Sequence, residues 1–189
     1  PTSGVNVPRR RVDREVSIWG VGLETGVTTP ITCRPAKTGT GIVFRRLDVA
    51  GSPEVPARLT EVEATERRTA IGHGERTIHT VEHLLAAVVA LGLDDLLVDL
   101  DGPEAPILDG SFAPYFELLS GAGIREQEGE PVVFRVQAPF QVTEGDSTYV
   151  VSPAKALRVT AMIEWPHPLI GRQTGTYDVT PEAFARDLA

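Results

Sequence analysis

Glu82 and His83 stand side by side at the start of an apolar stretch, residues 80–92, that reads TVEHLLAAVVALG. A neutral imidazole is a good zinc ligand, and a carboxylate beside it could take a proton from a zinc-bound water. Successive helical residues project roughly 100° apart, so one side chain could bind metal while the other reaches the water. On spacing alone a structural role is the more common explanation, because a lone Glu-His pair is a weak metal motif. An acid in a first turn complements the helix dipole, and a histidine there can be a partly buried hydrogen-bonding group.

A helix must position this pair. We expect it to run from Thr80, a good N-cap residue, to about Leu91, with Gly92 as its stop. Apolar residues at helical spacing predict its buried stripe, which comprises Val81, Leu84, Leu85, Val88 and Val89.

The segments around the helix predict short strands, because Val, Ile, Thr and Phe dominate them and Gly and Pro separate them. Those before the helix are EVSIWGVGL, TTPITCRPA, TGIVFRRLDV, VPARLTEVEA and RTAIG, and DLLVDLDG follows it. A second helix is expected within residues 106–124, capped by Asp109 or Ser111 and ended near Gly121–Gly123. Residues 1–12 are polar and basic, and we expect them to be frayed.

The strand pattern restarts after a polar linker at residues 125–131. It comprises VVFRV, FQV, TYVVS and LRVTAMIEW, with a hairpin turn at Glu144–Asp146. We therefore predict an α+β fold of two related sheet-plus-helix domains, residues 1–125 and 131–189, the second incomplete. A last helix at 181–189 would expose Phe184 and Leu188, so the C-terminal third is expected to be prone to aggregation.

Composition narrows the classes of partner. The net charge of −8 argues against a nucleic-acid binder and against attraction to anionic lipid. The single cysteine, Cys33, cannot form an internal disulfide and indicates a reducing, cytoplasmic setting. No apolar run approaches the ~20 residues of a membrane span, and no signal peptide is visible. The first residue is Pro1 and the last expected helix breaks off in mid-pattern, so we expect a fragment of a longer protein.

Several blocks of the chain, in order, resemble one family. HTVEHLLAAVVALGLDDLLVDLDGPEAPILDGS is similar to the core of the UDP-3-O-acyl-N-acetylglucosamine deacetylases, zinc hydrolases of lipid A synthesis. GVGLETG, RPAKTGTGIVFRRLD and VPARLTEVEATERRT resemble upstream family blocks, and IEWPHPLIG a later one. The resemblance implies a two-domain enzyme with its active site between the domains. Its substrate would be an acylated UDP-sugar, from which it removes the N-acetyl group.

The resemblance also implies roles for single residues. His83 matches a Zn²⁺ ligand and Glu82 the general base. Asp109 matches an aspartate associated with activity, although it is equally well explained as a turn and cap former before Ser111.

Three further positions are less specific. Trp165 could line the path of the sugar or acyl chain, or fill a core. Arg67 and Arg68 could meet the diphosphate, although two basic residues on a strand are more often a solvated edge.

This chain departs from the family pattern at three places. Glu24 replaces the histidine usual in the GVGLH block, and its role is open. Asp95 replaces the usual asparagine, which we take as a turn detail. The family's H-K-x-x-x-D motif, which supplies the remaining zinc ligands and a lysine, is absent, as are the late histidine and the T-F-G block.

The chain alone is therefore expected to be inactive, and the parent protein to be the deacetylase. Two alternatives are a non-catalytic nucleotide-sugar-binding protein of the same fold and a deacetylase for another N-acylated nucleotide sugar. A fused dehydratase domain, the acyl-chain preference and the oligomeric state are left undecided.

Overall fold

A computed structural model describes residues 7–64 and 66–189. It divides into two compact units. The first contains the chain through Pro131 together with Leu188 and Ala189, and the second comprises Val132–Asp187. Strands outnumber helices in both units, and the α+β class predicted from the sequence is confirmed.

The framework of the first unit is a five-stranded sheet in the order β2-β3-β8-β4-β5. Its strands are β2 (Val16–Val21), β3 (Thr28–Pro35), β8 (Leu96–Leu100), β4 (Ile42–Arg46) and β5 (Glu54–Pro56). The central strand β8 pairs antiparallel with β3 and parallel with β4. Each strand was expected from its composition, although its exact ends were not.

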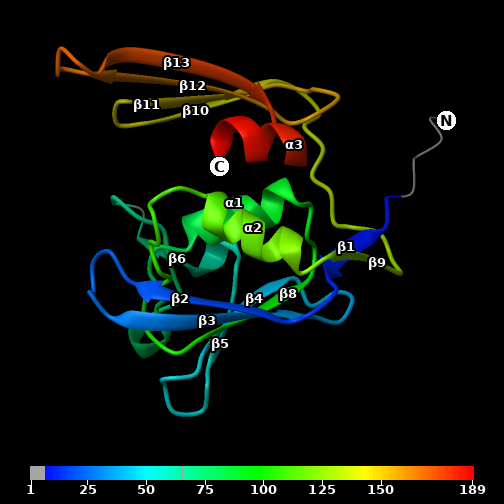
Figure 1. Cartoon of the computed structure of the whole chain (residues 1–189). Coiled ribbons are helices and arrows are strands. Elements are labelled where there is room, and N and C mark those ends of the chain that lie inside the picture. Colours follow the sequence, from blue (N-terminus) through cyan, green and yellow to red (C-terminus); the bar gives the residue numbers. More distant parts are fainter. Residues whose placement is uncertain (1–6, 65) are drawn as a thin grey trace. The chain divides into compact units, whose positions relative to one another are not determined.

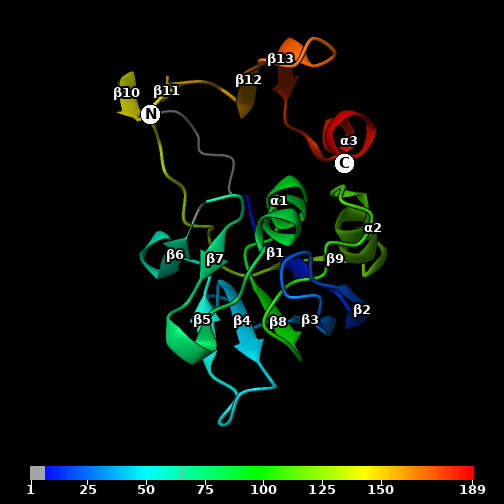
Figure 2. The same ribbon diagram turned by 90° about the vertical axis from the view of Figure 1, so that its left-hand side faces the viewer.

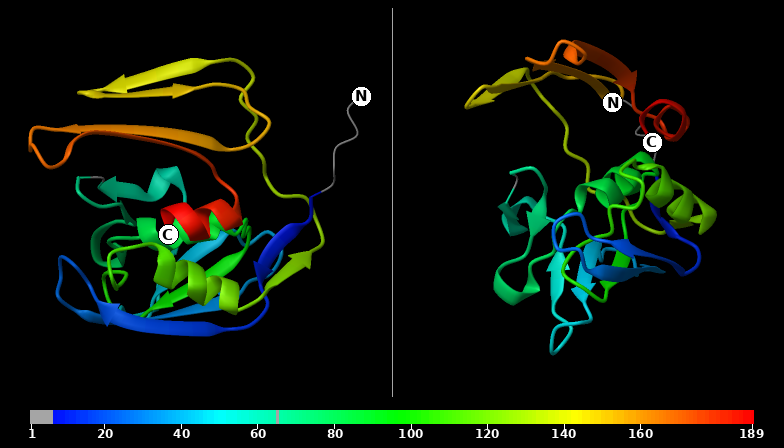
Figure 3. Two further views of the ribbon diagram at one scale, coloured as in Figure 1. Left: turned by 45° about the horizontal axis from the view of Figure 1, so that its top comes forward. Right: turned by 60° about the vertical axis from the view of Figure 1, so that its left-hand side comes forward.

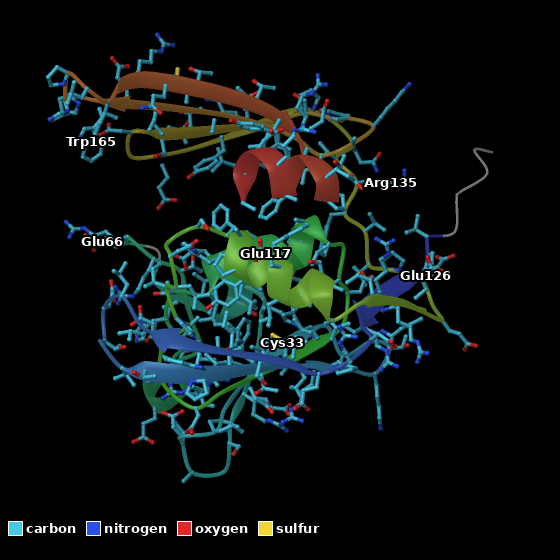
Figure 4. The ribbon with its side chains drawn as sticks, in the orientation of Figure 1. Cys33, Glu66, Glu117, Glu126, Arg135 and Trp165 are labelled. Atoms are coloured by element: carbon cyan, nitrogen blue, oxygen red, sulfur yellow. The ribbon has the colours of Figure 1, made fainter. Side chains whose placement is uncertain are left out.

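Two helices, α1 (Glu82–Ala90) and α2 (Ala113–Gly121), cover one face of this sheet (Figures 1 and 2). Alternation along the strands directs apolar side chains toward them. Ile31 and Cys33 of β3 and Val98 of β8 are fully buried there, and Figure 4 shows Cys33 between the strands and α2. The core therefore lies between the sheet and the two helices.

The opposite face of the sheet is polar. Asp99 of β8 accepts hydrogen bonds from the guanidinium Nε atoms of Arg34 and Arg45, at 2.8 and 2.7 Å. The Asp99 side chain is buried beneath these two arginines. Its charge is therefore balanced on the side of the sheet that faces away from α1.

The two ends of the first unit pair with each other in a two-stranded ribbon, which the sequence did not predict. Strand β1 (Arg9–Val12) pairs antiparallel with β9 (Ile124–Gln127). Residues 9–12 are thus not frayed, and 125–127 form a strand where a linker was predicted. Both segments are mostly polar and the side chains of β9 are largely exposed, so neither shows the apolar alternation that reveals a strand.

Asp95 fixes this ribbon to the sheet. Its fully buried carboxylate accepts two hydrogen bonds from Arg9, both 2.8 Å, one from Gly41 N at 2.8 Å and one from Gln127 at 3.0 Å. The interpretation of Asp95 as a turn detail is therefore wrong. Its partners lie far away in the sequence, where local turn chemistry gives no sign of them.

The β-rich segment between β5 and α1 is broken into short pieces. A 3₁₀ turn at Leu59–Glu61 precedes β6 (Val62–Ala64), which pairs with β7 (Ala70–Ile71), and a second turn follows at Gly74–Arg76. Arg67 and Arg68 lie in the connection between β6 and β7. The expectation that they sit on a strand is wrong, and the positive φ of Arg67, 62°, is a turn conformation.

The second unit contains two hairpins, drawn as separate ribbons in Figure 3, and the last helical segment of the chain. Strands β10 (Phe140–Glu144) and β11 (Ser147–Val151) meet at Gly145–Asp146, so the predicted hairpin turn is confirmed. Strands β12 (Arg158–Trp165) and β13 (Gly171–Asp178) form the other. Residues 132–136 were predicted as a strand but are not one, because a strand pattern without a pairing partner forms no ladder.

The last helical segment begins at α3 (Pro181–Ala183) and continues as one π-helical turn, Phe184–Leu188. Thr180 caps it through its side chain. Phe184 is buried, so its predicted exposure is wrong, while Leu188 is half-buried. No helix among the described residues is long and apolar enough to cross a membrane.

Candidate active site

The start of α1 presents Glu82 and His83, but Thr80 does not cap it. Val81 occupies the N-cap position, and within the described part of the chain no side chain caps the first turn. Thr80 has a φ of 59° and turns its hydroxyl to Glu104 instead, at 2.7 Å. The predicted cap is therefore wrong, because a buried carboxylate distant in the sequence competes for that hydroxyl.

The far end of α1 follows the prediction. Gly92 has a φ of 64°, its N–H bonds to the carbonyl of Val89, and that of Leu93 to the carbonyl of Val88. These are the two bonds of a Schellman ending. Leu84 and Val88 are buried as expected, but Val89 is 63% exposed. At about 100° per residue, Val89 projects roughly 140° away from Leu84, so the predicted stripe was too wide.

Glu82 is held by the backbone of a neighbouring loop. Its Oε2 atom accepts a hydrogen bond from the N–H of Thr69 at 3.0 Å. The side chain is half-buried, so part of it is accessible from solvent. The carboxylate has unused acceptor capacity, because an ionised carboxylate offers about four lone-pair sites. Glu82 can therefore keep its orientation and still accept a proton or another donor.

His83 is fixed by the loop that leads into α2. Its Nδ1 atom lies 3.3 Å from the backbone carbonyl oxygen of Ser111, and its ring meets that of Phe112 edge-on, with centroids 5.0 Å apart. A carbonyl oxygen can only accept, so Nδ1 must carry the proton in this contact. In the neutral ring Nε2 then has a free lone pair. This is the tautomer in which histidine binds a metal through Nε2.

Asp109 lies in the same loop. Its Oδ1 accepts from the N–H of Ser111 at 2.9 Å and from the Ser111 hydroxyl at 2.8 Å. These two bonds, and to a smaller degree the nearby His83, lower the pKa of the exposed Asp109 carboxyl. The turn-forming role is confirmed, but the predicted cap is wrong, because Phe112 occupies the N-cap position of α2. The structure also brings Asp109 to the loop that holds His83, whereas its part in activity stays a prediction.

Arg68 precedes Thr69, whose N–H binds Glu82, and joins two further residues. It forms an ion pair with Glu24 at 2.6 Å and donates from Nε to Nδ1 of His79 at 3.2 Å. Arg67 is exposed beside it. Glu24, which replaces the usual family histidine, thus has a partner that balances its charge. Diphosphate binding by either arginine remains a prediction.

Glu104 was not anticipated from the sequence. Its side chain is completely buried, and its carboxylate accepts bonds from the backbone of Glu24 and Thr25 and from the hydroxyls of Thr25 and Thr80. Burial alone would raise the pKa of Glu104, but these donors lower it below its ordinary value. The signal was its place between Pro103 and Pro106, in a block that is otherwise apolar.

Trp165 belongs to the second unit, at the end of β12, and is 60% exposed (Figure 4). A core-filling role for it is therefore wrong, because every residue of β12 is exposed and, among the described residues, β12 pairs only with β13. A role in lining the substrate path stays a prediction.

The metal-binding capacity of this chain is limited. Within residues 7–64 and 66–189, no three His, Cys, Asp or Glu side chains are placed to hold a metal ion together. A catalytic zinc takes about three protein ligands. His83 fits zinc as one of them, with its free Nε2, but the described residues do not complete such a set.

Glu82 and His83 thus stand half-buried at the start of a helix that packs on an α+β framework. Residues 9–189 match the family model described as UDP-3-O-acyl N-acetylglycosamine deacetylase. The chain belongs to this family, as the resemblance indicated.

Curated relatives carry the name UDP-3-O-acyl-N-acetylglucosamine deacetylase. The chain is 39% identical to that of Myxococcus xanthus over 181 residues, covering 96% of this chain and 58% of the relative. It is 36% identical to those of Citrifermentans bemidjiense and Bdellovibrio bacteriovorus, again over 96% of this chain, covering 59% and 60% of the relatives. The chain therefore spans about three fifths of the length of these relatives.

Proposed function

We propose that this chain carries the first part of the active site of a UDP-3-O-acyl-N-acetylglucosamine deacetylase, a zinc-dependent cytoplasmic hydrolase of lipid A synthesis. The observation that carries the proposal is the start of α1. There, Glu82 and His83 are held by separate backbone groups, Thr69 N–H and Ser111 C=O. Each side chain keeps the atom that chemistry needs, a carboxylate oxygen on Glu82 and Nε2 on His83.

The reaction is hydrolysis of an acetamide. The oxygen of a water molecule adds to the amide carbon, and Glu82 accepts the proton that this water gives up. The bond between carbon and nitrogen then breaks, the nitrogen takes up a proton, and acetate and a free amine are released. Asp109, in the loop that orients His83, would support the geometry of this centre.

Zinc would polarise the amide carbonyl and make water more acidic. Nε2 of His83 would be one ligand, oriented by the bond from Nδ1 to Ser111. The other ligands would come from the part of the protein that the longer relatives have in addition. We therefore expect the 189-residue chain alone to be inactive.

Arginine and tryptophan side chains supply the proposed substrate contacts beyond the reacting centre. Arg67 is the better candidate for a diphosphate contact, because Arg68 already forms an ion pair with Glu24. Exposed Trp165 would line the path of the sugar or acyl chain. These contacts would decide between UDP-3-O-acyl-N-acetylglucosamine and another N-acylated nucleotide sugar.

The test uses the product of the complete reading frame. Zinc content is measured by mass spectrometry after dialysis, and acetate release from UDP-3-O-acyl-N-acetylglucosamine is measured on the same samples. We expect about one zinc per chain, consistent with a single catalytic site, and loss of most of it in His83→Ala. His73→Ala is the matched control, since His73 is exposed in the turn before Gly74–Arg76.

The outcomes separate the candidates. Zinc loss in both variants would show that His83 has no special role. A wild-type protein without zinc that binds the nucleotide sugar but releases no acetate would be a binding protein of this fold. Release of acetate from a different N-acylated nucleotide sugar only would keep the chemistry and change the substrate.

A further inference from the structure

Glu104 connects two segments that carry residues of the candidate site. Its Oε1 atom accepts the hydroxyl of Thr80 at 2.7 Å, and its Oε2 atom accepts the N–H and the hydroxyl of Thr25, both at 2.8 Å. The N–H of Glu24 lies 3.2 Å from both oxygens. One buried carboxylate thus holds the loop of Glu24 and the residue that leads into α1.

The loop is built closely around this carboxylate. A Cβ atom on Gly22 would lie 2.3 Å from Oε2 of Glu104 and 2.7 Å from the Thr25 hydroxyl. Real Cβ atoms do not approach this closely, so Gly22 lets the backbone reach the carboxylate. The loop also closes on itself, since the N–H of Gly22 bonds to the carbonyl of Val27 at 2.9 Å.

Thr80 is held in a conformation that needs support. A φ of 59° is unfavourable for a β-branched residue, and such strain persists where the surroundings fix it. The Glu104 carboxylate holds its side chain. The backbone before it is held as well, because the N–H of His79 bonds to Pro103 O and the carbonyl of His79 accepts from Ala105 N, both at 3.0 Å. The direction in which α1 starts is therefore set here.

The charge of Glu104 distinguishes it from the other buried carboxylates. Asp95 and Asp99 each form ion pairs with arginines. For Glu104 the described part of the chain records neutral donors only, and each belongs to one of the two segments. Glu104 therefore joins these two segments through hydrogen bonds with neutral donors, where Asp95 and Asp99 use ion pairs.

We propose that Glu104 is a positioning residue, which holds the Gly22–Gly26 loop and Thr80 so that Glu82 and His83 take their working orientation. The effect on catalysis rests on the proposed function. The effect of Glu104 on the geometry of the helix start is independent of the proposed function. The effect on catalysis and the effect on geometry are measured separately.

The experiment compares Glu104→Gln and Thr80→Val with the control Asp99→Asn, all in the product of the complete reading frame. Glutamine would turn an NH₂ group toward the N–H of Thr25 or the hydroxyl of Thr80, and valine removes that hydroxyl. Asp99 is an equally buried carboxylate on the far face of the sheet. Thr80→Ser, which keeps the hydroxyl, should rescue what Thr80→Val loses.

The first readout is independent of activity. Amide exchange at Glu24 and Thr25 should become faster, and the imidazole signals of His83 should shift, in Glu104→Gln and Thr80→Val but not in Asp99→Asn. The second readout is steady-state kinetics at a temperature where every variant is folded. We expect kcat to fall about 10- to 100-fold with KM little changed, the cost of a small misplacement of catalytic groups.

The double variant Glu104→Gln, Thr80→Val should lose no more than the worse single variant, because both remove one unit. Unchanged His83 signals in both single variants would overturn the proposal, as would an equal loss of kcat in Asp99→Asn. If Glu104→Gln does not fold, the comparison of Thr80→Val with Thr80→Ser in the same two readouts tests the proposal. A wild-type protein that lacks deacetylase activity would refute the proposed function, and the exchange and imidazole signals would still decide the role of Glu104.

Discussion

His83 Nδ1 and the carbonyl oxygen of Ser111 lie 3.3 Å apart, which places the proton of the neutral imidazole on Nδ1. His79 shows the reverse arrangement, because Arg68 donates to its Nδ1 at 3.2 Å and leaves the proton on Nε2. The two histidines, four positions apart, are therefore expected to be opposite tautomers. The ring nitrogen left free for a metal is Nε2 in His83.

This difference can be measured by ¹⁵N NMR of the imidazole rings at mildly alkaline pH. We expect the Nδ1–H form for His83 and the Nε2–H form for His79. His79 serves as the internal control, and Arg68→Ala should release its preference without altering that of His83. A His83 ring in the Nε2–H form would contradict its assignment as an Nε2 metal ligand.

Glu82→Gln tests the general base. Glutamine keeps the size of the side chain and its bond to Thr69 N–H but cannot take a proton. We expect kcat of the complete protein to fall about 10²- to 10⁴-fold, the usual contribution of a general base, with zinc content unchanged. Glu117→Gln, at an exposed position of α2, is the matched control. Equal loss in both variants, or loss of zinc in Glu82→Gln, would remove Glu82 from the role of base.

The sequence alone predicted the framework of the first unit well. Its strands and the end of α1 at Gly92 follow from local rules, since apolar alternation and a glycine at positive φ act within a few residues. The pair Glu82 and His83 was found because two chemically capable side chains stand at the edge of an apolar helix.

The predictions that were wrong concern residues whose hydrogen-bond partners lie far away in the sequence. Thr80 has the residue type of a helix cap, but its hydroxyl donates a hydrogen bond to Glu104, 24 positions later. The composition of residues 9–12 predicts a frayed end, but Arg9 donates a hydrogen bond to Asp95, 86 positions away, and this bond holds the segment. The ion pair of Arg68 with Glu24 spans 44 positions. The tertiary fold determines which polar groups become partners in the interior, so the composition and spacing of the sequence do not predict these pairs.

The Arg9–Asp95 pair should matter greatly for stability. Removing one partner of a buried ion pair leaves the other uncompensated, which typically costs about 3–5 kcal/mol. We therefore expect Arg9→Ala and Asp95→Ala each to lower the free energy of unfolding by this amount, measured by urea denaturation. The exposed pair Arg125–Asp13, 3.1 Å apart, joins strand β9 of the same ribbon to the residue after β1, and Asp13→Ala is the control with little expected effect. Similar losses in Asp13→Ala and Asp95→Ala would show that burial of the pair is unimportant.

Acid should weaken the first unit through its buried carboxylates. Burial opposes the charge of Asp95, Asp99 and Glu104, but their donors outweigh it and lower each pKa below its ordinary value. A carboxyl whose pKa is lowered by folding stabilises the protein above its unfolded pKa and loses that contribution as pH falls through the folded pKa. The stability they provide should thus be complete at pH 7 and decline below about pH 4.

Urea midpoints between pH 7 and pH 3 check this expectation. Asp95→Asn should flatten the acid side of the profile, because its carboxyl no longer titrates. A profile that is as steep in Asp95→Asn as in the wild type would show that other groups cause the acid loss.

The second unit is expected to be much less stable than the first. Its hairpins β10–β11 and β12–β13 belong to separate two-stranded sheets, and two-stranded hairpins are at best marginally stable alone in water. Large apolar side chains remain exposed along it, for example Phe134 at 95%, Tyr149 at 63% and Leu169 at 89%. Apolar surface of this kind promotes association.

Amide hydrogen exchange on the 189-residue chain tests this expectation directly. Residues 132–187 should exchange fast, whereas β8 and α1, which form the core of the first unit, should be protected. Phe134→Ser and Leu169→Ser should reduce light scattering at high protein concentration, while Val89→Ser, at an exposed position of the first unit, is the control for removing one exposed apolar side chain. Strong cooperative protection throughout residues 132–187 would contradict the prediction, because it would require a packed core that two separate hairpins do not supply.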